Sequence, residues 1–156
     1  AFLAYARSEI PDQILSADVF AIICETQNDT EGIGQDFELI GENVDYVCPM
    51  AYPSHYARGQ IINNVKFPNP DLDPYNLIKN TFLKAKKRLE QSKVHKPILR
   101  PYLQDFTASW LPNGTWQKYG AKQVREQIQG LYDAGYEEWI FWDFMNTYSE
   151  AGFKKE

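Results

Sequence analysis

The sequence predicts an α/β protein of parallel βα units that together form half of a TIM-type barrel. Three observations lead to this fold class. Apolar, β-rich runs alternate with helical patterns, long links follow the runs, and the runs number four in 156 residues. Such alternation is typical of βα units in a parallel sheet. A complete eight-stranded barrel takes about 250 residues, so four strands correspond to half of one.

Each predicted strand is a mostly continuous apolar run, which is typical of strands covered on both faces. The four runs span residues 17–25, 44–52, 97–106 and 137–145. The links at 53–72 and 107–119 are rich in Gly, Pro, Asn and aromatic residues, whereas the links before strands are short. A barrel with a functional face at the carboxyl ends of its strands shows this asymmetry. A doubly wound sheet is the alternative, but no Gly-rich phosphate-binding turn follows any run.

Helical patterns fill the remaining segments. Helices are predicted over residues 1–10, 33–44, 73–92 and 120–136. The third has Asp73 as a plausible N-cap and Pro74 at its first helical position. The fourth ends at Gly135, which suits the position just past a helix. The basic run from Lys84 to Arg88 is predicted to be a solvated face of the third helix.

Size and composition indicate one domain, residues 1–156, with 44% hydrophobic residues for a core. A net charge of -5 with both signs present argues against binding to nucleic acid or to an anionic membrane. No apolar run approaches the roughly 20 residues of a membrane span. Cys24 and Cys48 have no metal-ligand spacing, so we expect buried thiols, no metal and no cofactor. A disulfide between neighbouring strands is the less favoured alternative.

The stretch "VDYVCPMAYPSHY" runs from a strand straight into aromatic, hydroxyl and imidazole groups. The carboxyl ends of parallel strands meet at one face, so Tyr52, Ser54 and His55 are candidate substrate-binding residues. Aromatic faces suit the apolar faces of sugar rings, and hydroxyl and imidazole groups suit sugar hydroxyls. The alternative is structural, with Pro49 and Pro53 fixing a loop in which His55 bonds local carbonyl groups.

Carboxylates also follow the predicted strands. Asp105, beside Gln104, is the first candidate for catalysis, although it would also suit the cap of a following turn. Asp143 is the second, because its neighbours Trp142 and Phe144 form an apolar setting that favours an acid. Gln104, Trp142 and Asn146 complete the substrate-binding candidates. Glu25 opens a polar loop and is expected to be exposed to solvent.

Arg100 lies within the third apolar run, and a buried arginine requires a carboxylate partner. Asp18 and Asp45, near the starts of neighbouring strands, are the candidates. Trp110 and Trp116 lie in the long link after that run, where two indoles favour a binding role.

Three segments carry a family resemblance: "IGQDFELIGENVDYVCPMAYPSHY", "PILRPYLQDF" and "GYEEWIFWDFMNTY". Together they resemble the C-terminal half of a bacterial family, the putative glycosyl hydrolase domain, a TIM-barrel domain of unknown function. The resemblance covers about Ser16 to Tyr148, and "PMAYPSHY" is its most specific element. It implies that the strands are the fifth to eighth of a barrel. The family's fourth strand ends in Asp-Tyr-(Val/Ile)-Arg-Phe-Pro, which is not matched here, so we expect the chain to be incomplete and inactive alone.

The resulting hypothesis is a glycoside hydrolase-like domain that acts on a polysaccharide or cell-envelope glycan through acid/base carboxylates. The alternative is a non-catalytic carbohydrate-binding barrel domain, and a third is a structural domain. The resemblance implies an extracellular or cell-envelope location in a bacterium. Four βα units alone would leave open sheet edges and an uncovered apolar inner face. We therefore also expect two copies to associate there, or the sheet to close in a way that the strand count does not predict.

Overall fold

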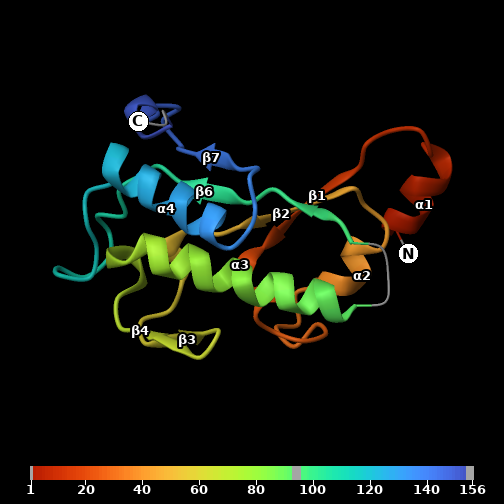
Figure 1. The fold of residues 1–156 in the computed structure, drawn as a ribbon, viewed down its shortest axis with the longest axis horizontal. Helices are drawn as coiled ribbons and strands as arrows, with labels where there is room; N and C mark the ends of the chain where they lie inside the picture. The colour runs from red at the N-terminus through yellow and green to blue at the C-terminus, as the bar shows by residue number, and fades with distance from the viewer. Residues whose placement is uncertain (1, 93–95, 154–156) are drawn as a thin grey trace.

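The computed structural model describes residues 2–92 and 96–153, and it shows an open parallel sheet with helices packed against it (Figure 1). The sheet contains β1 (Ser16–Phe20), β2 (Tyr46–Met50), β5 (Ile98–Leu99), β6 (Tyr102–Gln104) and β7 (Ile140–Trp142). The strand order is β1-β2-β6-β7, and β5 also pairs with β2. All of these pairings are parallel. The predicted α/β fold with a parallel sheet is therefore confirmed.

The register aligns residues of one face across four strands. Phe20 pairs with Met50, Met50 with Tyr102, and Tyr102 with Ile140. The carboxyl ends of the strands point to the side that holds the loop before α4 and the C-terminal segment (Figure 1). No closure into a barrel is seen within the described residues. The half-barrel therefore stays a prediction.

In the described part of the chain, four α-helices and four short 3₁₀ helices complete the main framework. The α-helices are α1 (Phe2–Glu9), α2 (Phe37–Gly41), α3 (Pro74–Gln91) and α4 (Ala121–Asp133). The 3₁₀ helices are η1 (Ala21–Cys24), η2 (Pro53–His55), η3 (Pro70–Leu72) and η4 (Glu150–Gly152). The predicted start of α3 is confirmed, because the Asp73 side chain accepts a hydrogen bond from the N–H of Asn76. Gly135 has φ 89°, the left-handed conformation expected after a helix.

One face of the sheet packs against α3 and α4. Val47 and Leu103 from the strands share a buried cluster with Phe82 of α3 and Ile128 of α4. The two helices lie side by side (Figure 1), and Gly130 lets them approach, because a Cβ there would lie 2.5 Å from the Tyr75 carbonyl oxygen. This core fixes the strands whose ends carry the candidate site.

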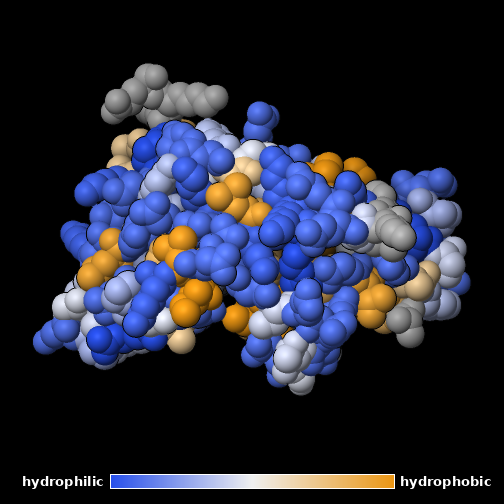
Figure 2. All heavy atoms as spheres, turned by 60° about the horizontal axis from the view of Figure 1, so that its bottom comes forward, coloured by the Kyte–Doolittle hydropathy of each residue, from blue (hydrophilic) through white to orange (hydrophobic). Residues whose placement is uncertain are grey.

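The other face of the sheet has no helix over it within the described residues. Phe20, Ile98 and Trp142 are 54%, 47% and 46% exposed on this open face. The continuous apolar runs indicated that both faces of the sheet are covered. That inference was wrong, because apolar residues of these runs, such as Phe20 and Ile98, lie on the open face. Elsewhere, Figure 2 shows a mostly hydrophilic surface with hydrophobic residues gathered in separate patches.

All four predicted strands are shorter than their apolar runs, and β7 covers only Ile140–Trp142 of the run 137–145. The run 17–25 leaves the sheet after Phe20 and turns into η1. The run 97–106 divides into β5 and β6, because Pro101 lies between them and has no N–H to donate. The link 53–72 contains an unpredicted hairpin of β3 (Gln60–Ile62) and β4 (Val65–Phe67). Asn63 and Asn64 form its turn with φ 49° and 65°.

The basic run on α3 is not simply a solvated face. Arg88 is buried, with 7% of its surface exposed, and its guanidinium bonds the Glu38 carboxylate. It also donates to the carbonyl groups of Ile23 and Thr26. The prediction was wrong for Arg88, because this side chain joins α3 to η1 and α2.

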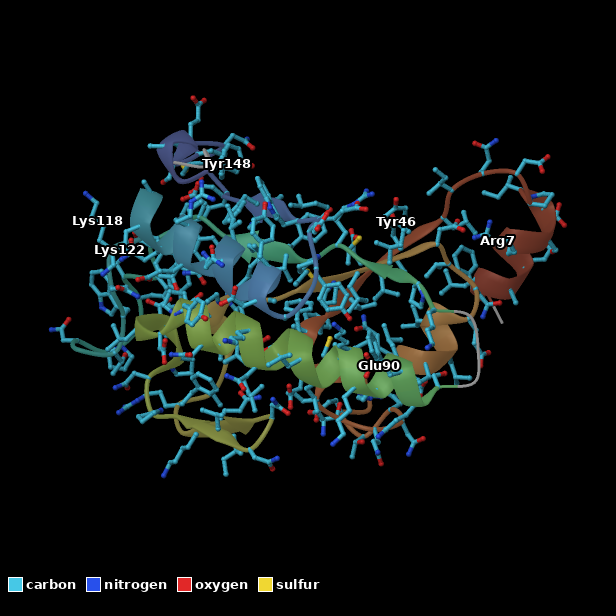
Figure 3. The ribbon with its side chains drawn as sticks, in the orientation of Figure 1. Arg7, Tyr46, Glu90, Lys118, Lys122 and Tyr148 are labelled. Atoms are coloured by element: carbon cyan, nitrogen blue, oxygen red, sulfur yellow. The ribbon has the colours of Figure 1, made fainter. Side chains whose placement is uncertain are left out.

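Ion pairs at the amino ends of the strands also differ from expectation. Arg100 pairs with Glu138 at 2.6 Å rather than with Asp18 or Asp45, and it remains partly exposed. Asp45 instead pairs with Arg7 of α1, also at 2.6 Å. Figure 3 shows Arg7 near one end of the molecule and Tyr148 toward the other, so this pair lies far from the strand-end loops.

Both cysteines are buried and free, as expected. Burial raises the pKa of Cys48 to about 11 and that of Cys24 further, which keeps both as thiols. Across residues 2–92 and 96–153, no helix is long and apolar enough to cross a membrane. The same residues contain no cluster of three or more His, Cys, Asp or Glu side chains suited to a metal ion.

Candidate functional site

Aromatic rings from three strand ends meet at the carboxyl edge of the sheet. This aromatic cluster consists of Tyr52, His55, Phe106, Trp110 and Phe144. The centroid of Phe106 lies 5.6 Å from that of Tyr52, 5.9 Å from Trp110 and 6.0 Å from Phe144. Trp110 and Phe144 are 61% and 59% exposed. The cluster therefore presents apolar ring surface to solvent beside Tyr52 and His55, two of the predicted substrate-binding residues.

A buried hydrogen-bond network supports this cluster from below. Gln104 is fully buried, and its Oε1 accepts from the N–H of Ser54 at 3.0 Å and from Ser54 Oγ at 2.8 Å. Its Nε2 donates to Asp71 Oδ1 at 3.1 Å and to the Phe106 carbonyl at 2.9 Å. All hydrogen-bonding groups of the Gln104 amide are thus used within the protein. This side chain fixes the positions of Ser54 and Phe106.

Asp71 is a member of this network that the sequence did not single out. It is 1% exposed and also accepts from the N–H of Gln117 at 3.0 Å. Burial raises the pKa of Asp71, and hydrogen bonds from Gln117, Gln104 and Tyr119 oppose the increase. In the sequence Asp71 lies in the proline-rich link "PNPDLDP", which gives no local signal of burial. Its partners are far along the chain, so only the fold reveals its role.

Asp105 lies directly beside the aromatic cluster, at the end of β6. It is 5% exposed, and its N–H bonds the Trp142 carbonyl at 3.0 Å. Oδ2 accepts from the N–H of Ser149 at 2.6 Å, whereas the buried Oδ1 has no partner among the described residues. Burial raises the pKa of Asp105, the Ser149 N–H opposes this, and the nearby Asp143 charge raises it further. Asp105 is therefore a carboxyl group with one uncommitted oxygen.

Asp143 has a different environment. Its Oδ1 accepts from the N–H of Met145 at 2.6 Å and from that of Thr147 at 3.4 Å. The turn-capping role that the sequence offered for Asp105 is therefore found at Asp143. Asn146 lies in the same turn, exposed and with φ 54°, and Trp142 lies on the open face of the sheet.

Glu25 is not the solvent-exposed side chain that the sequence predicted. Its Oε1 is buried without a partner among the described residues, and its Oε2 accepts from the N–H of Asn63 at 3.4 Å. Burial raises the pKa of Glu25 to about 7, despite opposition from the Asn63 hydrogen bond and from Lys84 and Arg88. The cause of the error is the β3–β4 hairpin, which covers Glu25. Trp116 Nε1 is likewise buried without a partner in the described part of the chain.

The fold and the strand-end residues define an α/β domain with polar and aromatic groups gathered at the carboxyl edge of a parallel sheet. A comparison with known protein families identifies the family of this domain. The chain belongs to the family described as "Putative glycosyl hydrolase domain", whose model matches residues 1–148. This confirms the resemblance seen in the sequence. No match was found among curated proteins or among solved structures.

Proposed function

We propose that this chain is a glycoside hydrolase-like domain that acts on a polysaccharide or cell-envelope glycan, with Asp105 as the general acid. The observation that carries the proposal is the buried, unpartnered Oδ1 of Asp105 beside exposed aromatic rings. Membership of the glycosyl hydrolase-like family supports it at a coarse level. The corresponding location is extracellular or in the envelope of a bacterial cell.

The environment of Asp105 suits proton donation to a glycosidic oxygen. Cleavage of a glycosidic bond requires a carboxylic acid that protonates the leaving oxygen. Burial disfavours the charged form of Asp105 and raises its pKa, the direction that favours a proton donor. Because Oδ2 already accepts from the Ser149 N–H, a proton on this carboxyl group would reside on Oδ1. That oxygen is buried and has no competing partner among the described residues, so it would be free to bond a substrate that reaches it.

The remaining site residues fall into contact and support roles. Tyr52 joins Trp110 and Phe144 in providing apolar faces for sugar rings. His55 offers a hydrogen bond to hydroxyl groups, and Ser54, whose Oγ is bound to Gln104 and His55, orients the His55 imidazole. Trp142 and Asn146 extend the rim toward the end of β7. Gln104 holds Ser54 in place through two hydrogen bonds and acts as a positioning residue.

Asp143 is the proposed second carboxylate, since glycosidases generally use two. A specific observation also favours the alternative, a non-catalytic carbohydrate-binding domain. Oδ1 of Asp143 is already bound by two backbone N–H groups, a commitment typical of a structural cap. A domain with this aromatic cluster and only one free acid would still bind glycans.

A glycan panel separates these functions. Binding is measured by calorimetry and bond cleavage by release of reducing ends, using both the 156-residue chain and the full product of its gene. Binding with cleavage by the gene product supports the hydrolase. Binding without cleavage by either form supports the alternative, and no binding by either form contradicts both. Cleavage by the chain alone would overturn the expectation that it is inactive in isolation.

A further inference from the structure

A cavity of about 270 Å³ lies beside His55, at the carboxyl ends of β1 and β2. Its apolar wall comes from Phe20, Ala21, Ile22 and Met50, and its polar groups come from His55 and Gln60. The ring of Tyr56 also lines it, while the Tyr56 hydroxyl is hydrogen-bonded to Thr81. Within the described chain, no Asp, Glu, Lys or Arg side chain lines this cavity. The volume is just below the roughly 300–1,000 Å³ typical of ligand pockets, so it suits one small group of a larger ligand.

The hydrogen bonds of His55 determine which of its nitrogens faces a ligand as an acceptor. Ser54 Oγ uses its single hydrogen to donate to Gln104 Oε1, at 2.8 Å. Ser54 Oγ must then accept from His55 Nδ1, which lies 3.0 Å away. In a neutral imidazole a protonated Nδ1 leaves Nε2 as an acceptor. Partial burial lowers the pKa of His55, which favours that neutral form.

Gln60 provides the complementary group. Its Oε1 accepts from the N–H of Ala57 at 2.9 Å, which orients the side-chain amide. The Nε2 group has no partner among the described residues and is left as a donor. The cavity thus combines one acceptor, one donor and an apolar wall.

We propose that this cavity binds the acetamido group of an N-acetylated sugar. The acetamido N–H would donate to His55 Nε2, its carbonyl oxygen would accept from Gln60 Nε2, and its methyl group would contact Ile22 and Met50. The inference rests on the proposed function and names the substrate class, a glycan that contains N-acetylated amino sugars.

Other sugar substituents match the cavity less well. A ring hydroxyl has no apolar part to fill the wall formed by Phe20 and Ile22. A carboxylate or phosphate would lose its hydration without gaining a cation, which is costly in an apolar site. The acetamido group satisfies both polar residues and also buries a methyl group.

The test compares two trisaccharides that differ only at this substituent. Binding of tri-N-acetylchitotriose and of cellotriose to the chain is measured by isothermal titration calorimetry. We expect the chain to prefer the N-acetylated sugar by about tenfold or more, the effect of two hydrogen bonds and a buried methyl group.

Variants test whether the preference for the N-acetylated sugar arises in the cavity. Gln60→Glu keeps the acceptor for Ala57 but removes the donor, so it should abolish the preference and leave cellotriose binding unchanged. Ile22→Phe should have the same effect by filling the cavity. Gln27→Glu makes the same chemical change at an exposed position and should preserve the preference. Circular dichroism establishes that each variant is folded.

Each outcome has a distinct meaning. Equal binding of the two sugars overturns the acetamido site and leaves a carbohydrate-binding function standing. A preference that survives both cavity variants also overturns the site. Failure to bind any glycan contradicts the proposed function itself, and the inference with it.

Discussion

Two aspartates at neighbouring strand ends have different environments. Asp105 and Asp143 both follow short apolar strands in the sequence, and both are buried. The sequence could identify them as candidates, because carboxylates after parallel strands gather at one edge. The sequence could not show that the two carboxyl groups have different hydrogen-bond partners. That difference depends on which backbone N–H groups are near, and those of Ser149 and Met145 are positioned by the chain after β7.

Asp105→Asn should lower glycan cleavage by the full gene product about 10²–10⁴-fold, the usual effect of losing an acid/base group. The fold should be retained, since the carboxamide oxygen of the variant would still accept from the Ser149 N–H and the side chain carries no charge to bury. Initial rates of reducing-end release measure the effect, with Asp12→Asn, an exposed position, as control. Near-normal turnover would exclude Asp105 and leave Asp143 as the next candidate.

Glu25 should make stability depend on pH. Its pKa is about 7 in the fold against an ordinary 4.5, so between these values the folded state binds more protons than the unfolded state. Its contribution is fully present below pH 4.5 and is lost as pH rises through 7. Glu25→Gln stays neutral and still accepts from Asn63. Its melting temperature should therefore rise relative to the native chain from pH 5 to pH 8, and a constant difference would contradict this.

At the scale of elements, local signals predicted helices better than strands. Asp73, Pro74 and Gly135 act within one turn of the chain, and α3 and α4 have the predicted ends to within a few residues. The strands depend on distant partners. β1 ends where the chain stops pairing with β2. No local signal in "AIIC" distinguishes the 3₁₀ helix η1 from a continued strand. The β3–β4 hairpin was missed because Asn63–Asn64 is a weaker turn signal than Asn-Gly.

Gly130→Ala should destabilise the protein although alanine favours helices by about 1 kcal/mol. The added Cβ would meet the Tyr75 carbonyl oxygen at 2.5 Å, so α3 and α4 would have to move apart. Overpacking of this kind costs about 1–3 kcal/mol, which should appear as a lower melting temperature. Gln129→Ala, at the exposed neighbouring position, should change it little. An unchanged or higher value for Gly130→Ala would show that the contact is not tight.

At the scale of the whole molecule, the sheet has one covered face and one open face. Phe20, Ile98 and Trp142 lie on the open face, beside the less exposed Tyr46 and Met50. Exposed apolar patches of this kind mark association surfaces. The sequence predicted this feature from the number of strands, since four βα units do not enclose their own inner face.

The chain should self-associate through this open face in a concentration-dependent manner. Ile98→Arg places a charge on the face and should shift the equilibrium toward monomer. Ile61→Arg makes the same change on the exposed hairpin, where Ile61 is 64% exposed, and should have no such effect. Multi-angle light scattering over a range of concentrations measures the mass, and a constant monomer would contradict the prediction.

The attachment of α1 to the rest of the fold depends on ionic strength. The helix has no buried residue, and Arg7 joins it to the Asp45 carboxylate and to the Gln13 carbonyl. Exposed ion pairs contribute only about 0–1 kcal/mol, and added salt reduces that contribution further. Added salt therefore weakens one of the contacts that hold α1, the other being Leu3 against the core, while leaving the apolar core against α3 and α4 intact. The amino-terminal helix becomes the part of the fold that opens first, independently of the strand-end site.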